Sequence, residues 1–389
     1  MNIQLNTMKK IIISLSLLIL SGCTSNPMTS IATTEAGIKK SSATQRNINV
    51  IALSNTSTLA SITPQLAQSK VVLVGESHTT YGDHLNQLAI IKNLSPHWKK
   101  MAIGLEFVQY PYQSALNDYI AGKITEKQML RKTQWYERWR YDFRLYRPIF
   151  EYAKQQQIPL LALNTPREIT KRISKVGIKG LSSVERAQLP KVIDTSNAEY
   201  KKALKTVYNQ HGGKSRSKKF ERFYQAQLAW DETMADQTAQ FMRKHPNHRV
   251  VLLAGSGHMK DRHGIPSRLQ RRIKSKPLVV LNGVHENPSP LQADYLLFSP
   301  DTQLPKAGKM GIFMKDTTKG VLISKVMKAS ASAKAGLKKG DLITQLNGEK
   351  VKTVEDIKLS MMEAKPKEKL LLSVLRAGQQ KISKTIILQ

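Results

Sequence analysis

The sequence predicts an α/β fold: a mostly parallel sheet with helices on both faces and a long helical insert, followed by a small β-rich domain. Three observations lead to this prediction. Several short apolar runs have no polar break, which is typical of strands buried on both faces of a parallel sheet. Stretches with apolar residues at helical spacing alternate with these runs. After about residue 300 the pattern changes to short strands with frequent glycine.

The predicted elements of the main domain follow one another in a regular order. Five buried strands are expected, at residues 70–76, 101–106, 158–164, 249–255 and 277–282, and a last one at 293–299. Helices are expected at 84–94 and 143–156. The insert at 183–245 contains no strand-like run, and its second half, 219–244, reads as one long helix.

Polar residues stand at the carboxyl ends of these strands. The first strand runs into Gly75-Glu76-Ser77-His78 and the fourth into Gly255-Ser256-Gly257-His258, so both end in Gly-x-x-His. Glu106 and Asn164 end the second and third strands. Because parallel strands place these ends along one edge, where open α/β sheets bind ligands, the sequence predicts one shared site. The alternative is that these residues cap helices or satisfy buried backbone groups.

The amino terminus has the pattern of an export signal. Lys9 and Lys10 precede an apolar run at 11–20, which is too short to span a membrane. The run closes on Leu-Ser-Gly-Cys at 20–23, which resembles a bacterial lipobox, and Cys23 is the single cysteine. The resemblance implies a lipoprotein signal peptide at 1–22, a palmitate-bearing lipid anchor on Cys23 and a flexible tether at 23–47. It implies a bacterial cell envelope location, at the outer membrane facing the periplasm.

The chain is strongly basic. It has 61 lysine and arginine residues against 28 acidic ones, a formal net charge of +33. These basic residues are spread through both domains, and no nucleic-acid recognition motif accompanies them. Attraction to an anionic membrane surface or an anionic ligand is therefore favoured, and a nucleic-acid partner is not expected.

A set of motifs in fixed order resembles the ChaN-like haem-binding lipoproteins of the Tiki superfamily. The matching segments are GESH at 75–78, GLE at 104–106, Trp135 with Trp139 and YRP at 146–148, ALN at 162–164, QLAWDETMA at 227–235 and AGSGH at 254–258. The resemblance implies a haem-binding α/β domain over 48–299, with a role in iron acquisition. The wider superfamily includes metal-dependent peptidases with paired Gly-x-x-His motifs and a glutamate.

The C-terminal segment resembles a bacterial PDZ domain, over 308–389 after a linker at 300–307. The matching segments are GVLISKV at 320–326, AGLKKGDLI at 335–343 and NGEKV at 347–351. In such domains a loop of backbone N–H groups holds a peptide C-terminus while the peptide adds a strand to the sheet. Gly311, Ile312 and Phe313 occupy that loop position, so we expect protein or peptide C-termini as partners.

Three hypotheses about function remain open at this point. In the first, haem is the cofactor, held by residues at the strand ends and their neighbours: Glu76, His78, Glu106, Tyr110, Tyr112, Tyr146, Asn164, Arg167 and His258. In the second, the chain is a metal-dependent hydrolase, with His78 and His258 holding a divalent metal ion and Glu76 or Glu106 as general base. In the third, it is a non-catalytic PDZ scaffold.

The lipobox generates the first prediction. Cys23→Ala should leave the protein without its lipid anchor, because no other thiol is available for modification. Phase partitioning of cell extracts in a detergent that separates on warming should then move the variant into the aqueous phase. If the variant enters the detergent phase to the same extent as the protein that keeps Cys23, then Cys23 does not carry the anchor.

Overall fold

The computed structural model describes residues 53–210, 217–283, 289–298 and 301–389. The predicted signal peptide, Cys23 and the tether lie outside the described residues. Within the described part of the chain, no helix combines the length and the apolar composition needed to cross a bilayer.

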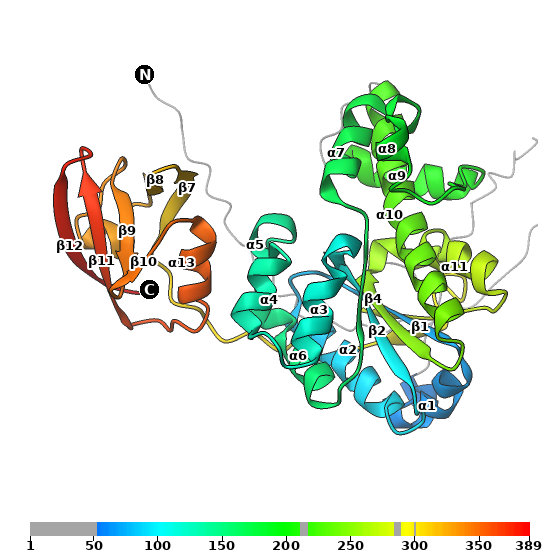
Figure 1. Ribbon diagram of the computed structural model, residues 1–389. Coiled ribbons are helices and arrows are strands. Elements are labelled where there is room, and N and C mark those ends of the chain that lie inside the picture. Colours follow the sequence, from blue (N-terminus) through cyan, green and yellow to red (C-terminus); the bar gives the residue numbers. More distant parts are fainter. Residues whose placement is uncertain (1–52, 211–216, 284–288, 299–300) are drawn as a thin grey trace, which may run out of the picture. The chain divides into compact units, whose positions relative to one another are not determined.

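The main domain is built on a six-stranded parallel sheet with the strand order β3-β2-β4-β1-β5-β6 (Figure 1). This arrangement confirms the predicted α/β fold class. Five strands lie where the apolar runs predict them, and the sixth falls within 293–299. Their bounds are β1 Val71–Glu76, β2 Met101–Gln109, β3 Leu160–Asn164, β4 Arg249–Gly255, β5 Leu278–Asn282 and β6 Tyr295–Leu297.

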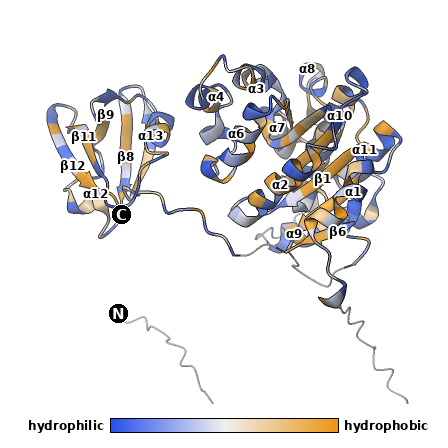
Figure 2. Ribbon diagram, turned by 90° about the horizontal axis from the view of Figure 1, so that it is seen from below, coloured by the Kyte–Doolittle hydropathy of each residue, from blue (hydrophilic) through white to orange (hydrophobic). Residues whose placement is uncertain are grey.

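The strands bury both of their faces because successive side chains point to opposite sides. Val72 and Val74 of β1 pack into one core with α1 (Leu59–Gln68), α2 (Tyr81–Leu94), α3 (Gln113–Ile120) and α6 (Arg147–Gln155). Val71 and Leu73 pack into a second core with α10 (Ser217–Lys244) and α11 (Ile265–Ile273). Figure 2 shows hydrophobic residues along the central strand β1. The two cores explain why these strands read as unbroken apolar runs.

Among the remaining helices, those that follow a strand at its carboxyl end are α7 (Arg167–Val176) and the 3-10 turns Tyr110–Tyr112 and Ser256–His258. The predicted helix at 143–156 is divided, and α6 begins only at Arg147, because Pro148 has no N–H and suits a first helical turn. The other helices are α4 Glu126–Lys132, α5 Trp135–Arg138, α7 Arg167–Val176, α8 Ser183–Arg186, α9 Ala198–Gln210, and the 3-10 turns Leu53–Asn55, Tyr110–Tyr112, Phe143–Leu145, Ile178–Gly180, Ser256–His258 and Lys260–Arg262.

A buried carboxylate joins α10 to α11. Glu232 of α10 has no exposed surface, and its oxygens lie 3.2 Å from Arg268 Nε, 3.0 Å from Arg271 Nη2 and 2.6 Å from Arg272 Nη2. All three arginines belong to α11. Because a buried carboxylate is tolerated only when it is paired, this cluster holds α11 on α10. The segment between β4 and α11, which carries the second Gly-x-x-His, is thereby anchored at both ends.

The C-terminal domain is a separate antiparallel sheet with the order β12-β11-β9-β8-β7 and its own core around Val321, Ile343 and Leu372. Strand β7 lies at an edge of this sheet, and Gly311 just before it has φ = +74°, a conformation that favours glycine. The element bounds are β7 Ile312–Thr317, β8 Gly320–Val326, α12 Ala331–Lys334, β9 Leu342–Leu346, β10 Glu349–Lys350, α13 Val354–Ser360, β11 Lys369–Arg376 and β12 Gln380–Ile387.

Candidate functional site

Three neighbouring strands bring the predicted site residues together. Strand β4 lies between β2 and β1, with Glu76 of β1 beside Gly255 of β4 in the register. Glu106 belongs to β2, whereas His78 and His258 lie in the turns that follow β1 and β4. The parallel direction of the strands therefore places two carboxylates and two imidazoles at one edge of the sheet.

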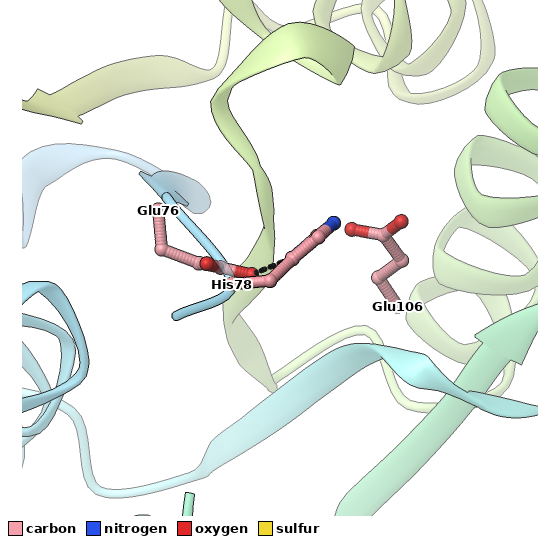
Figure 3. Close-up of side chains that lie close together, drawn as sticks. All are labelled: Glu76, His78 and Glu106. Atoms are coloured by element: carbon pink, nitrogen blue, oxygen red, sulfur yellow. Dashed lines mark hydrogen bonds and ion pairs between the residues drawn. The ribbon is translucent and has the colours of Figure 1, made fainter. Parts of the chain in front are cut away.

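The carboxylates and imidazoles alternate at this edge. His78 Nδ1 lies 2.5 Å from Glu76 Oε1, and Figure 3 shows the other side of the His78 ring directed toward Glu106. Glu106 Oε2 accepts a 2.7 Å hydrogen bond from the Gly255 N–H, and Glu106 Oε1 lies 3.3 Å from His258 Nε2. The four side chains thus lie together as two carboxylate–imidazole pairs, Glu76 with His78 and Glu106 with His258.

His258 is held from its second nitrogen as well. Its Nδ1 lies 2.6 Å from Asp231 Oδ1, and Asp231 Oδ2 accepts a 2.6 Å hydrogen bond from the hydroxyl of Tyr200. Asp231 belongs to α10 and has no exposed surface. Both nitrogens of His258 are therefore engaged by carboxylates, which favours the doubly protonated ring.

The protonation of the site follows from these contacts. Burial alone would raise the pKa of Glu106, but the charge and the hydrogen bond of His258 lower it to about 2. Burial alone would lower the pKa of His258, but Glu106 and Asp231 raise it well above its ordinary value. The two residues therefore form a buried ion pair over the neutral pH range.

The Glu76–His78 pair is different. Burial raises the pKa of the Glu76 carboxyl, and the hydrogen bond from His78 opposes that shift only in part. Burial lowers the pKa of His78, but Glu76 and Glu106 raise it by more, so the net shift is upward. Glu76 Oε2 is buried and has no hydrogen-bond partner among the described residues. His84 Nε2 lies 4.0 Å from it.

A residue without a side chain is needed at Gly255, which lies between His78 and Glu106. A Cβ at this position would lie 2.9 Å from His78 Cε1 and 3.7 Å from Glu106 Oε2. The first distance is shorter than van der Waals contact, so any larger residue would push the His78 ring away. The glycine of the second Gly-x-x-His motif therefore makes room for the histidine of the first.

The polar group opens into a cavity of about 400 Å³. His78, Glu106 and His258 line it on the side of the sheet, and its walls include the rings of Trp139, Tyr141, Trp230 and Phe107. The imidazole of His78 contacts Trp139 and Tyr141, with ring centroids 4.8 and 5.0 Å apart. Gln109, Arg138, Asn164, Arg167, Thr170 and Gln227 complete the lining. The cavity thus combines a cluster of aromatic rings with many polar and charged side chains, the groups that orient a bound small molecule.

Three tyrosines named by the sequence do not line this cavity. The Tyr110 hydroxyl donates to the Gln188 carbonyl at 3.2 Å, and the Tyr112 hydroxyl donates to Gln134 Oε1 at 3.2 Å. Tyr146 is fully buried, and its hydroxyl donates to the His78 carbonyl at 3.3 Å. Tyr146 therefore supports the backbone behind the site, and Tyr141 is the tyrosine that faces the cavity in the described part of the chain.

Of the other predicted residues, Glu76 is buried behind His78 and does not line the cavity, whereas Asn164 and Arg167 do. Asn164 has a structural role as well. Its Nδ2 donates to the Glu106 carbonyl at 2.9 Å and its Oδ1 accepts from the Thr165 N–H, so its amide closes the ends of β2 and β3. Arg167 lines the cavity and donates from Nη1 to the Glu137 carbonyl at 3.0 Å.

Sequence reasoning missed several residues of the site. Asp231 lies inside the QLAWDETMA motif, but nothing in a helical pattern shows that its carboxylate faces a histidine 27 residues later. Gln109 ends β2 three residues beyond the predicted strand, Arg138 ends α5, and Tyr141 lies in the loop that follows α5. A screen for aromatic and basic residues after the second strand would have found Arg138 and Tyr141 but not Gln109.

A metal ion would find ligands in part of the site. Glu76, His78 and Glu106 each offer one ligand atom within 4.8 Å of the others. His258, which the sequence offered as the second histidine ligand, is outside this set because its nitrogens face Glu106 and Asp231.

The ion pair of Glu106 generates a pH prediction. The pKa of Glu106 in the folded protein is about 2, against 4.5 for the free group. The charge therefore stabilises the fold above about pH 4.5, and that contribution is lost as the pH falls toward 2. Glu106→Gln should lower the free energy of unfolding by about 3 kcal/mol at pH 6, with the deficit shrinking below pH 4.5. Denaturant unfolding at pH 6, 4 and 3 measures this. A deficit that does not change with pH would contradict the ion-pair assignment.

Comparison with known proteins identifies both halves of the chain. Residues 62–269 match a family model with the description "Haem-binding uptake, Tiki superfamily, ChaN". Residues 308–386 match a model of the PDZ domain. The solved structure of ChaN from Campylobacter jejuni, with cofacial haem bound, has a TM-score of 0.51 to this chain at 21% identity. It covers 62% of this chain and 91% of that one, and at this identity the likeness shows the shared fold.

Curated relatives share a shorter part of the chain. The periplasmic endoprotease DegQ of Escherichia coli is 37% identical over 130 residues, which are 33% of this chain and 26% of DegQ. The endoprotease DegP of Escherichia coli is 28% identical over 131 residues, 34% of this chain and 26% of DegP. The chain thus spans about a quarter of the length of these relatives. Because the first family model covers more than half of its residues, the chain belongs to the ChaN haem-binding uptake family of the Tiki superfamily, and it carries a PDZ domain.

Proposed function

We propose that the protein binds haem in the cavity at the carboxyl edge of the parallel sheet, with His78 as the iron ligand. The observation that carries this proposal is the environment of His78. Its Nδ1 is held by Glu76 at 2.5 Å, and its ring lines the cavity with 29% of the side chain exposed. A histidine that donates one N–H to a carboxylate is fixed in orientation and made more basic at its other nitrogen, which suits a metal ligand.

The remainder of the cavity fits a flat, largely apolar ligand. Trp139 meets the His78 ring in a T-shaped arrangement, Tyr141 lies at a tilt to it, and Trp230 contacts His258. Aromatic rings provide the apolar surface that a porphyrin requires. When bound, haem supplies an iron atom for ligation, and the protein's own groups hold the macrocycle and limit its contact with water. Membership in a haem-binding family supports the same assignment.

His258 has a different role in this proposal. Because Glu106 and Asp231 engage both of its nitrogens, it has no free lone pair for iron. It acts by compensating the buried charge of Glu106, whose other oxygen is held by the β4 backbone. His258 is therefore a positioning residue, and His78 is the residue that contacts the cofactor.

A divalent metal ion is the second candidate ligand. The convergence of Glu76, His78 and Glu106 favours it, as does the buried Glu76 Oε2 that lacks a hydrogen-bond partner. Oxygen and nitrogen ligands at this spacing suit zinc or manganese, with Glu106 or Glu76 available to take a proton from a bound water in a hydrolase. Metal content by mass spectrometry, before and after haem loading, separates this candidate from haem.

The proposal for the whole chain combines three parts. The lipid anchor at Cys23 holds the protein at the bacterial envelope, facing the periplasm. The main domain binds haem for iron acquisition. The PDZ domain recruits proteins through their C-termini at the edge strand β7, which ends the sheet next to Gly311.

The haem proposal predicts distinct effects of the two histidines. His78→Ala should weaken haemin binding at least about tenfold and remove the visible absorption bands of an imidazole-ligated iron. His258→Ala should keep those bands, although it weakens binding by disturbing Glu106. Absorption titration with haemin measures both. The matched control is His97→Ala, at an exposed histidine outside the cavity.

Two results would contradict the ligand assignment. Unchanged bands in His78→Ala would show that another group holds the iron, and their loss in Tyr141→Phe would then identify the phenol in the same cavity. Absence of haemin binding by the unmodified protein would refute the haem proposal itself.

The PDZ assignment predicts a dependence on a free carboxylate. Peptides selected for binding should lose most of their affinity when the C-terminus is amidated, because backbone N–H groups near Gly311, Ile312 and Phe313 would lose their anionic partner. Fluorescence anisotropy with paired free and amidated peptides tests this. Equal affinity of the two forms would show that the peptide uses another groove.

A further inference from the structure

We propose that Arg138 is a carboxylate-binding subsite of this cavity, and that Glu168 occupies the place which a carboxylate of the ligand takes. The inference rests on the proposed haem function, because haem carries carboxylate side chains beside its apolar ring. It adds a recognition residue that lies away from the iron ligand, at the rim of the same cavity.

Arg138 is held in position without help from Glu168. Its Nε donates to Gln134 Oε1 at 2.7 Å, and its Nη1 donates to Gln109 Oε1 at 2.8 Å. The guanidinium also lies over the ring of Tyr112, 5.0 Å from the centroid. These neutral partners fix the plane of the guanidinium but leave its charge unbalanced. A preorganised cation of this kind binds an anion at a lower entropic cost.

Glu168 supplies the balancing charge from the surface. Its two oxygens accept hydrogen bonds of 2.9 and 3.1 Å from Nη2 and Nη1 of Arg138, the two-point geometry of an arginine–carboxylate pair. The exposures are unequal: 13% of the Arg138 side chain is exposed, against 65% of Glu168. The arginine is therefore fixed, whereas the glutamate can turn into solvent at little cost.

The backbone of Arg167 adjoins this subsite. Gln109 Oε1, which accepts from Arg138, also accepts from the backbone N–H of Arg167 at 3.2 Å. Arg138, Gln109 and Arg167 all line the cavity that His78 lines, whereas Glu168 does not. Arg138 therefore links the cavity to the surface position that Glu168 occupies. A ligand carboxylate that displaced Glu168 at this edge of the cavity would keep the two-point geometry with Arg138.

If a haem carboxylate displaces Glu168 from Arg138, substitutions of Glu168 and of Arg138 should change the affinity for haemin in opposite directions. Glu168→Gln removes the competing carboxylate and should tighten haemin binding about two- to fivefold. Arg138→Lys keeps the positive charge but loses the planar fork, and should weaken haemin binding about tenfold. Haemin dimethyl ester has the same ring and iron but no free carboxylate, so neither substitution should change its affinity.

The experiment is an absorption titration of the purified protein with haemin and with haemin dimethyl ester in the same detergent. Glu151→Gln is the matched control for charge, since it removes an exposed carboxylate that does not line the cavity. It should leave both affinities as they are. Arg172→Lys is the corresponding control for the arginine, on the same helix as Glu168 and outside the cavity lining.

The outcomes separate this subsite from the haem function. If the protein without substitutions binds haemin, and Glu168→Gln binds haemin with equal or lower affinity, then a haem carboxylate does not replace Glu168 on Arg138. Parallel changes for haemin and its dimethyl ester would show that Arg138 supports the fold and does not recognise a carboxylate. If the unmodified protein binds neither compound, the proposed function fails and the subsite with it.

Discussion

The site depends on the burial of one negative charge, that of Glu106. Its two oxygens are held by the end of β4 and by the turn that follows it: the N–H of Gly255 and the imidazole of His258. A buried carboxylate without such partners would be costly, so the ion pair requires His258 to be protonated. That protonation in turn requires Asp231, which is held by Tyr200. One charge on β2 thus determines the position of the β4 turn and links it to α10.

The two Gly-x-x-His motifs look equivalent in the sequence but have different roles in the structure. His258 lies between two carboxylates, and its ring is committed on both sides. His78 is committed on one side to Glu76, and the remainder of its ring lines the cavity. The difference arises because α10 supplies Asp231 to His258, whereas aromatic residues surround His78. Only the second environment leaves a nitrogen available to a ligand.

The polar residues at the strand ends divide into two groups by the same reasoning. The amides serve the backbone: Asn282 Nδ2 donates to the Gly75 carbonyl at 2.7 Å, and Asn164 Nδ2 donates to the Glu106 carbonyl. The charged groups, together with the arginines at the rim, form the lining that meets a ligand. Neutral amides can satisfy carbonyl groups at the ends of parallel strands, because these groups have no further strand partner there. Charges at this edge require counter-charges, which here come from neighbouring carboxylates and imidazoles.

The sequence by itself determined the α/β fold class, the order of the elements and the identity of the residues at the strand ends. The reason is that buried parallel strands must be apolar on both faces, and that their carboxyl ends share one edge. Tertiary structure decided which of these residues face the cavity. Tyr146 turned inward behind His78 while Tyr141 lines the cavity, a choice made by the packing of the loop before α6. Asp231 and Arg138 reach the site across long stretches of chain, and such contacts depend on helix packing that no local pattern encodes.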